Sequence, residues 1–357
     1  MMNAIESSIV ARAITLGYAN ARVKAMKQLL LTHKETDAMA EATGVEEVYA
    51  LLERTQYRQD LVSSALAGKT LADQIEFACA KNFSRTLRKI IKIVPKKLSQ
   101  KISEMFEKYE INNIKTIILA KHMGEGKERI SHLLIETGML SKAATAKMLE
   151  SKSVKDVSAA LAGTIYGTIL EKNMKKYEKE KEAAPLLAAL DDYYYRKLPH
   201  IAKNPYGDER IILAMLKAQV DAKNISNILR GKKEGMKEEK ITEIIIAGGN
   251  ISRDRLVQAA GAKGVEEAAK AFEKNFKLAK ALEAYKKNGS LIPIEIEVEK
   301  SVARKGLSLL SVSVLSIGAI AGFLFLKEEE ASNIRKIVRA KEFNLSAEKI
   351  GEMIVQY

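Results

Sequence analysis

Hydrophobic residues recur every three or four positions along most of the chain, which is the spacing of one face of an α-helix. Strict alternation of apolar and polar residues is scarce, and its clearest instance is IPIEIEVE at 292–299, just after KKNGS. Only five prolines occur, and we expect them between the long helices, where a missing backbone donor is tolerated. The pattern predicts an all-α protein in which 292–299 is the one candidate for a short extended piece.

One twelve-residue segment occurs three times, as EINNIKTIILAK at 110–121, DAKNISNILRGK at 221–232 and EASNIRKIVRAK at 330–341. Each copy begins with an acid, which is Glu110, Asp221 or Glu330. Asparagine follows at position +3, as Asn113, Asn224 and Asn333, and lysine closes each copy at +11, as Lys121, Lys232 and Lys341. The copies lie 111 and 109 residues apart, which indicates an internal triplication.

Helix geometry assigns roles to the positions of this repeat. Positions +4, +7 and +8 are aliphatic and form one stripe that should face the core. The asparagine lies beside that stripe, where its amide is expected to satisfy a neighbouring helix end. The acid is expected to open the helix and the lysine to close it, as the helix dipole favours.

Position +9 points away from the apolar stripe and holds Leu119, Arg230 and Arg339. Arginine is favoured at protein contacts because its planar head carries several donors, so Arg230 and Arg339 could line a common binding surface. Two exposed arginines that only confer solubility are the alternative.

The similarity extends beyond this helix. Residues 138–157 parallel 249–268 with a shift of 111, and GVEEVYALLER at 44–54 parallels GVEEAAKAFEK at 264–274 with a shift of 220. We therefore expect three helical units, at 1–104, 105–215 and 216–357, around a pseudo-threefold axis. The C-terminal segment should pack near the N-terminus.

Composition narrows the function classes. The net charge of +14 favours anionic partners, and the run at 81–101 has eight basic residues and no acid. That run is either a phosphate-binding surface or a solvated helix face. The single cysteine, Cys79, excludes an internal disulfide and reads as a core residue. No metal-ligand or nucleotide-binding pattern occurs, and HMGEGKER at 122–129 is interpreted as a turn, so no catalytic residue, metal site or cofactor is predicted.

The three motif copies, with GYANARVKAM near the start, Thr55 and Tyr57 in T-x-Y, and LDDYYYRKL at 190–198, resemble the C subunit of archaeal-type rotary ATPases. That family is related to the d subunit of the eukaryotic V-type enzyme. The resemblance spans essentially the whole chain, and Leu119 departs from it by standing where the other two copies have arginine.

The resemblance implies a funnel of three similar helical domains, peripheral to the membrane and on the cytoplasmic face of the cell membrane. Its partners would be the membrane proteolipid ring and the central-shaft D and F subunits, and nucleic acid would not bind. Such a protein catalyses nothing and binds no cofactor, because its work is to couple ion flow through the ring to ATP synthesis or hydrolysis. From orientation and repetition, the residues expected at partner contacts are Arg230, Arg339, Lys121, Lys232 and Lys341.

The segment GLSLLSVSVLSIGAIAGFLFL at 306–326 has no charged residue and is long enough to cross a bilayer. However, its end occupies the place held before the first two motif copies by segments too polar to do so, so we interpret it as a buried core segment. Two other functions remain as alternatives, namely a basic helical-repeat scaffold that binds nucleic acid and a single-span membrane protein through 306–326.

Overall fold

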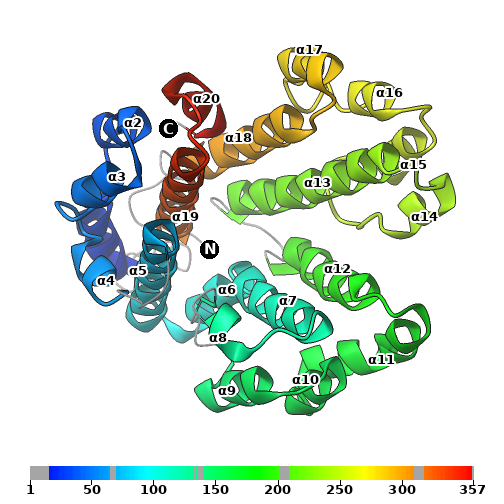
Figure 1. Ribbon diagram of the computed structural model, residues 1–357, viewed down its shortest axis with the longest axis horizontal. Helices are drawn as coiled ribbons and strands as arrows, with labels where there is room; N and C mark the ends of the chain where they lie inside the picture. The colour runs from blue at the N-terminus through cyan, green and yellow to red at the C-terminus, as the bar shows by residue number, and fades with distance from the viewer. Residues whose placement is uncertain are drawn as a thin grey trace, which may run out of the picture. The chain divides into compact units, whose positions relative to one another are not determined.

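The computed structural model of the 357-residue chain describes residues 16–64, 70–131, 134–135, 140–201, 209–308 and 317–355. Helices joined by turns, bends and irregular segments make up these ranges, and no strand occurs within them, so the predicted all-α class is confirmed. The described residues belong to two compact units, one formed by 45–194 and the other by 1–44 together with 195–357 (Figure 1). The predicted limits at 104 and 215 fall inside helices, and the threefold division stays a prediction.

The unit at 45–194 contains, in order, α3 (Val45–Leu52), α4 (Arg58–Val62), α5 (Leu71–Ile93), α6 (Lys96–Met105), α7 (Lys108–His122), α8 (Lys127–Ile130), α9 (Lys142–Glu150), α10 (Val154–Ala160), α11 (Ile165–Glu180) and most of α12 (Ala184–Ile201). The other unit contains a helical stretch at 16–27, α2 (His33–Glu41), α13 (Glu209–Lys233), α14 (Glu238–Glu243), α15 (Arg253–Ala260), α16 (Val265–Lys270), α17 (Ala279–Asn288), α18 (Ile292–Ser308), α19 (Ile317–Glu342) and α20 (Ala347–Met353).

Helix α5 shows how the basic run at 81–101 is used. Thr70 and Asp73 form a capping box at its start, and Cys79 is fully buried along its apolar face, as predicted. Near its middle the Arg85 guanidinium donates to the carboxylate of Asp60 at 2.7 Å, and Asp60 is only 2% exposed. At least one cation of the basic run therefore stabilises the unit, which weakens the interpretation of the run as a phosphate-binding surface.

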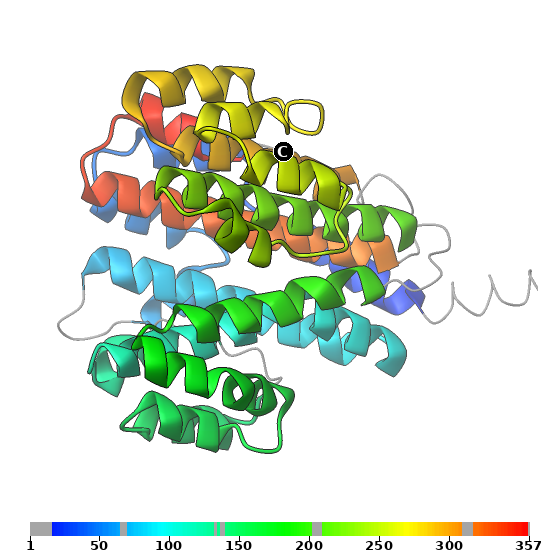
Figure 2. The ribbon, with the colours of Figure 1, turned by 90° about the vertical axis from the view of Figure 1, so that its right-hand side faces the viewer.

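In the unit that contains both chain ends, α13 packs against α18, and α18 packs against α19 (Figures 1 and 2). The apolar stripe of the second motif copy lies in its core, because Ile225, Ile228 and Leu229 are all buried. Helix α2, from the N-terminal part of the chain, packs on α19 and α20.

The prediction of an extended segment at 292–299 is wrong, because these residues form the first turns of α18. Ile294 and Val298, four residues apart, are the buried positions, and this is helical spacing. The intervening acids make the sequence look alternating, but they form ion pairs on the helix surface, Glu295 with Arg230 and Glu297 with Arg304. The expected placement of prolines is also wrong at one position, since Pro199 lies inside α12 near its end.

The apolar segment at 306–326 is described at 306–308 and 317–326, whereas 309–316 lie outside the described residues. Residues 317–326 begin α19, and Ile320, Phe323 and Leu324 are at most 1% exposed, so this part lies in the core as expected. Among the described residues, every helix is too short or too polar to cross a membrane.

The three motif helices end in the same way. Just past each end stands a residue with positive φ, which is Gly124 (74°), Gly235 (69°) or Asn344 (56°). The next amide donates back to the small residue at +10, from Glu125 to Ala120, from Met236 to Gly231 and from Leu345 to Ala340. This is the Schellman arrangement, and it turns the chain sharply toward the following short helix.

We expect Gly235→Ala to lower the free energy of unfolding by about 1 kcal/mol, because a Cβ is strained at positive φ. A Cβ built there meets no atom within 4 Å, so a loss would report backbone strain and not a clash. Asn344→Gly is the matched variant and should be neutral or slightly stabilising. Chemical denaturation followed by circular dichroism measures both, and equal losses in the two variants would contradict this account.

Candidate functional site on the repeated helices

The asparagine at +3 makes the same contact in all three copies. Its Nδ2 donates to a backbone carbonyl 22 residues further on, and its Oδ1 accepts from the amide of that same residue. The pairs are Asn113 with Ile135, Asn224 with Ile246 and Asn333 with Val355, and the donor–acceptor distances run from 2.7 to 2.9 Å. Each asparagine amide thus makes the two hydrogen bonds that a neighbouring backbone would otherwise make. It satisfies the backbone N–H and C=O groups of a buried residue.

This contact differs in one respect from the expected one. The asparagines do not cap a helix end, because each one bonds a non-helical residue a few positions after the short helix α8, α14 or α20. Each such residue is aliphatic and at most 9% exposed. We call this pair of hydrogen bonds from the asparagine the clamp. It fixes the point where the chain, having left the motif helix, returns to the core.

The acid at position 0 accepts hydrogen bonds from the segment that comes next along the repeat. Glu110 accepts from the amide of Leu140 at 3.3 Å, and Asp221 accepts from the amides of Asn250 at 3.1 Å and Ile251 at 3.0 Å. Both acids are 2% exposed. A carboxylate at each of these positions anchors the loop that precedes α9 or α15.

The third copy completes this pattern with a residue from the opposite end of the chain. Glu330 accepts from the amide of Leu31, just before α2. Leu31 is the counterpart of Ile251 under the shift of 220 that aligns 44–54 with 264–274. Glu330 also forms an ion pair with Lys327, and both side chains are at most 2% exposed. The N-terminal segment therefore supplies the loop that the third motif helix would otherwise lack.

The prediction that the acid opens each motif helix and the lysine closes it is only partly right. Glu110 does lie in the first turn of α7, but Asp221 and Glu330 lie in the middle of α13 and α19. The reason is that α13 and α19 each begin well before their motif copy. In the first copy the corresponding stretch is divided into two helices, α6 and α7, with a break at Phe106. The three lysines do occupy last turns, where a cation is favourable.

The residues expected at partner contacts fall into two groups. At position +9, Leu119 and Arg230 are exposed, and the Arg339 side chain is 36% exposed. The lysines at +11 are less accessible, since Lys121 donates to the carbonyl of Leu149 at 2.7 Å and Lys341 is only 9% exposed. Lys232 is half-buried. The arginines are therefore better placed for a partner than the lysines, and the contact assignment itself stays a prediction.

Arg230 is held in place by α18. Its Nε donates to Glu295 at 2.7 Å, and that hydrogen bond raises the pKa of the Arg230 guanidinium. Arg339 likewise contacts Glu342 at 2.7 Å on its own helix. Sequence patterns do not reveal Glu295, because it stands within the segment expected to be extended. Each guanidinium is oriented by an acid of its own unit.

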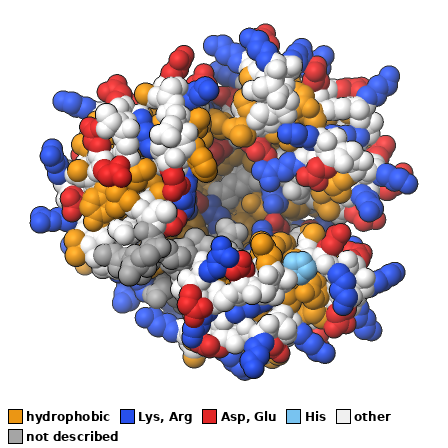
Figure 3. All heavy atoms as spheres, in the orientation of Figure 1, with side chains coloured by type: hydrophobic (Ala, Val, Ile, Leu, Met, Phe, Trp, Pro, Cys, Tyr) orange, Lys and Arg blue, Asp and Glu red, His pale blue; other side chains and the backbone are white. Residues whose placement is uncertain are grey.

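Lysine and arginine side chains appear over both units on the face shown in Figure 3, with acids among them. The face drawn carries mixed charge rather than a continuous basic strip. Among the described residues, no group of histidine, cysteine and acidic side chains has the arrangement of a metal site.

Comparison with known proteins assigns this architecture to a family. A profile of the family described as ATP synthase (C/AC39) subunit matches residues 19–353. The chain is 28% identical over 344 residues to the C subunit of the A-type ATP synthase of Methanocaldococcus jannaschii, covering 95% of this chain and 86% of the relative. It is 26% identical to the protein of the same name from Thermoplasma acidophilum, covering 94% of this chain and 96% of the relative.

A third relative gives the same result. The C subunit of the A-type ATP synthase of Methanococcoides burtonii is 29% identical over 341 residues, which cover 95% of this chain and 93% of the relative. The profile spans all three motif helices and the N-terminal segment that closes the third one. The chain therefore belongs to the ATP synthase (C/AC39) subunit family.

Proposed function

We propose that this protein is the C subunit of an A-type rotary ATPase and acts as its central-stalk coupling subunit. In this role it links the membrane proteolipid ring to the rotating shaft, so that ion flow is coupled to ATP synthesis or hydrolysis. The observation that carries the proposal is the family match over 19–353, supported by relatives that are named as C subunits of A-type ATP synthases. The protein itself would be non-catalytic and would sit on the cytoplasmic face of the membrane as a peripheral protein.

The packing of the described residues supports a mechanical role. Torque is transmitted well by densely packed interiors, because they deform little. In each copy the motif helix is tied to the chain 22 residues on by the two hydrogen bonds of an asparagine. The buried acids add a second tie at Leu140, Ile251 and Leu31. Such ties resist sliding of the motif helices against their neighbours.

The proposed partners are the central-shaft D and F subunits on one side and the proteolipid ring on the other. The direct test is a pull-down of the purified chain with the D–F pair from the same complex. Specific capture that survives at moderate salt would support the proposal. Absence of capture, combined with tight and salt-sensitive retention of RNA on a filter, would instead favour the nucleic-acid-binding scaffold.

Charge reversal tests the contact residues. We expect Arg230→Glu with Arg339→Glu to weaken binding to the D–F pair by about tenfold or more, because arginine is enriched among energetically dominant interface residues. Arg210→Glu with Arg253→Glu changes the net charge equally at two other exposed positions of the same unit and should have a much smaller effect. Surface plasmon resonance provides both affinities. Equal weakening by the two double variants would remove Arg230 and Arg339 from the interface.

A further inference from the structure

A cationic hollow lies between α18 and the loop that joins α16 to α17. Its volume is about 400 Å³, and its lining includes Lys274, Lys277, Arg304 and Lys305. The loop residues come from 273–277, and the α18 residues stand at helical spacings that place Ser301, Arg304 and Lys305 on one face. All of them belong to one compact unit. Neither the motif helices nor the proposed coupling role makes use of this hollow.

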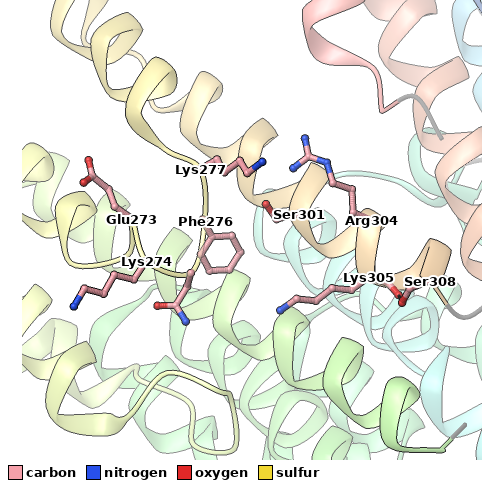
Figure 4. Close-up of a pocket in the computed structure, with 9 residues that line it drawn as sticks. Glu273, Lys274, Phe276, Lys277, Ser301, Arg304, Lys305 and Ser308 are labelled. Carbon is pink, nitrogen blue, oxygen red and sulfur yellow. Dashed lines mark hydrogen bonds between the residues drawn. The ribbon is translucent and has the colours of Figure 1, made fainter.

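Three of the cationic side chains, Lys277, Arg304 and Lys305, are directed toward the hollow, whereas Lys274 extends away from them (Figure 4). In Figure 4 Lys277 and Arg304 extend toward one another from the loop and from α18, and Lys305 reaches toward Phe276. The acidic lining residue, Glu273, points away from them. In the described part of the chain, neither Lys277 nor Lys305 forms an ion pair with an acid. Arg304 donates one bond to Glu297 at 3.1 Å, which leaves its remaining N–H donors available.

The loop is held in place independently of these cations. Phe276 is 4% exposed and packs in the core, so it anchors the residues on either side of it. Asn275 accepts a hydrogen bond from Arg255 at 2.9 Å, and the amide of Phe276 donates to the carbonyl of Phe272 at 3.0 Å. Lys277 is therefore presented from a fixed backbone, which lowers the entropic cost of binding a ligand.

We propose that this hollow is a binding site for a phosphate-bearing anion. Three cationic groups from two elements, with the Ser301 hydroxyl on the same helix face, suit a multivalent oxyanion with several acceptor oxygens. A single planar carboxylate would be matched by one guanidinium, so the number and spread of the cations favour phosphate. The phosphate could be carried by a soluble molecule or by the headgroup of an anionic lipid, and two probes separate these sources.

The test uses the full chain and both probes. Inorganic pyrophosphate is titrated in a calorimeter, and cosedimentation is measured with vesicles of phosphatidylcholine alone or mixed with phosphatidic acid. The variant Lys277→Gln with Lys305→Gln should weaken the interaction by at least about tenfold, given the usual contribution of a lysine beside an anionic surface. Both lysines are exposed, so the fold should persist, and circular dichroism verifies this.

The matched control is Lys240→Gln with Lys263→Gln, which removes the same charge from two positions of the same unit outside the hollow. Pyrophosphate binding that only the first variant abolishes would establish a site for a soluble phosphate. Binding only to phosphatidic acid vesicles, lost in the first variant alone, would establish a headgroup site. Equal losses in both variants, or binding of neither probe, would overturn the proposal.

Discussion

The substitution Asn224→Asp is expected to lower the free energy of unfolding by about 3 kcal/mol, although it replaces only the amide nitrogen of the side chain by oxygen. Asn224 is fully buried, and its amide donates to the carbonyl of Ile246 at 2.8 Å and accepts from the Ile246 amide at 2.8 Å. The carboxylate would keep the second bond, lose the first and place a charged oxygen against that carbonyl. Denaturant unfolding followed by circular dichroism measures the loss.

Two comparisons make this test specific. Asn275→Asp introduces the same change at an exposed asparagine whose Oδ1 accepts from Arg255, so it should cost little. Burial should raise the pKa of the carboxyl group introduced at 224 above its unfolded value. The stability loss should then be complete at neutral pH and shrink as the pH falls through that raised pKa, because the protonated group can donate again. A loss that equals that of Asn275→Asp at every pH would refute the clamp.

The sequence is sufficient to predict the helical class and the repeated helix, because both depend on local periodicity and on comparison of the chain with itself. The sequence also contains a sign of the residue whose backbone each asparagine binds. Ile135, Ile246 and Val355 all stand 25 residues after the first residue of their motif copy and are all aliphatic. One aliphatic residue recurring at one position is a weak signal without coordinates. The expected partner of the asparagine, a helix end, is wrong for this reason, although its structural role is right.

Comparison of the three repeats could not reveal that Lys327 is buried. The position three residues before each motif copy holds Glu107, Ala218 and Lys327. Glu107 accepts from the hydroxyl of Tyr166 at 2.8 Å, and burial, followed by the charge of Glu107, raises the pKa of that tyrosine. Ala218 simply packs in the core. Three different chemistries fill equivalent sites, so repetition carries no information there, and only tertiary contacts show which groups meet.

The short segment 292–299 shows the opposite failure, in which a pattern is present but misleading. Glu295, Glu297 and Glu299 alternate with apolar residues, yet each pairs with a basic side chain, and these three basic residues lie on α13, α18 and α19. A helix that is packed between two others needs ion-pairing residues on more than one side. That requirement produces an apparent period of two within a helix.

The N-terminal segment closes the third repeat through Glu330, so we expect a large loss of stability when this residue is replaced. Glu330→Ala should lower the free energy of unfolding by about 4 kcal/mol, because it removes the carboxylate of a buried ion pair with Lys327. It also removes the acceptor for the amide of Leu31. Hydrogen exchange should therefore rise in α2, which packs on α19 and α20. Denaturant unfolding and peptide-resolved exchange measure the two effects.

Glu110→Ala is the matched control in the first copy, where the carboxylate accepts from the amide of Leu140 and the residue three positions earlier is Glu107 instead of a lysine. Its cost should be about 1–3 kcal/mol, the usual range for a lost buried hydrogen bond. The double variant Lys327→Met with Glu330→Gln should recover most of the stability, since it removes both charges and keeps an acceptor for Leu31. If Glu330→Ala costs no more than Glu110→Ala and leaves exchange in α2 unchanged, the N-terminal segment is held by apolar packing and Glu330 does not close the repeat.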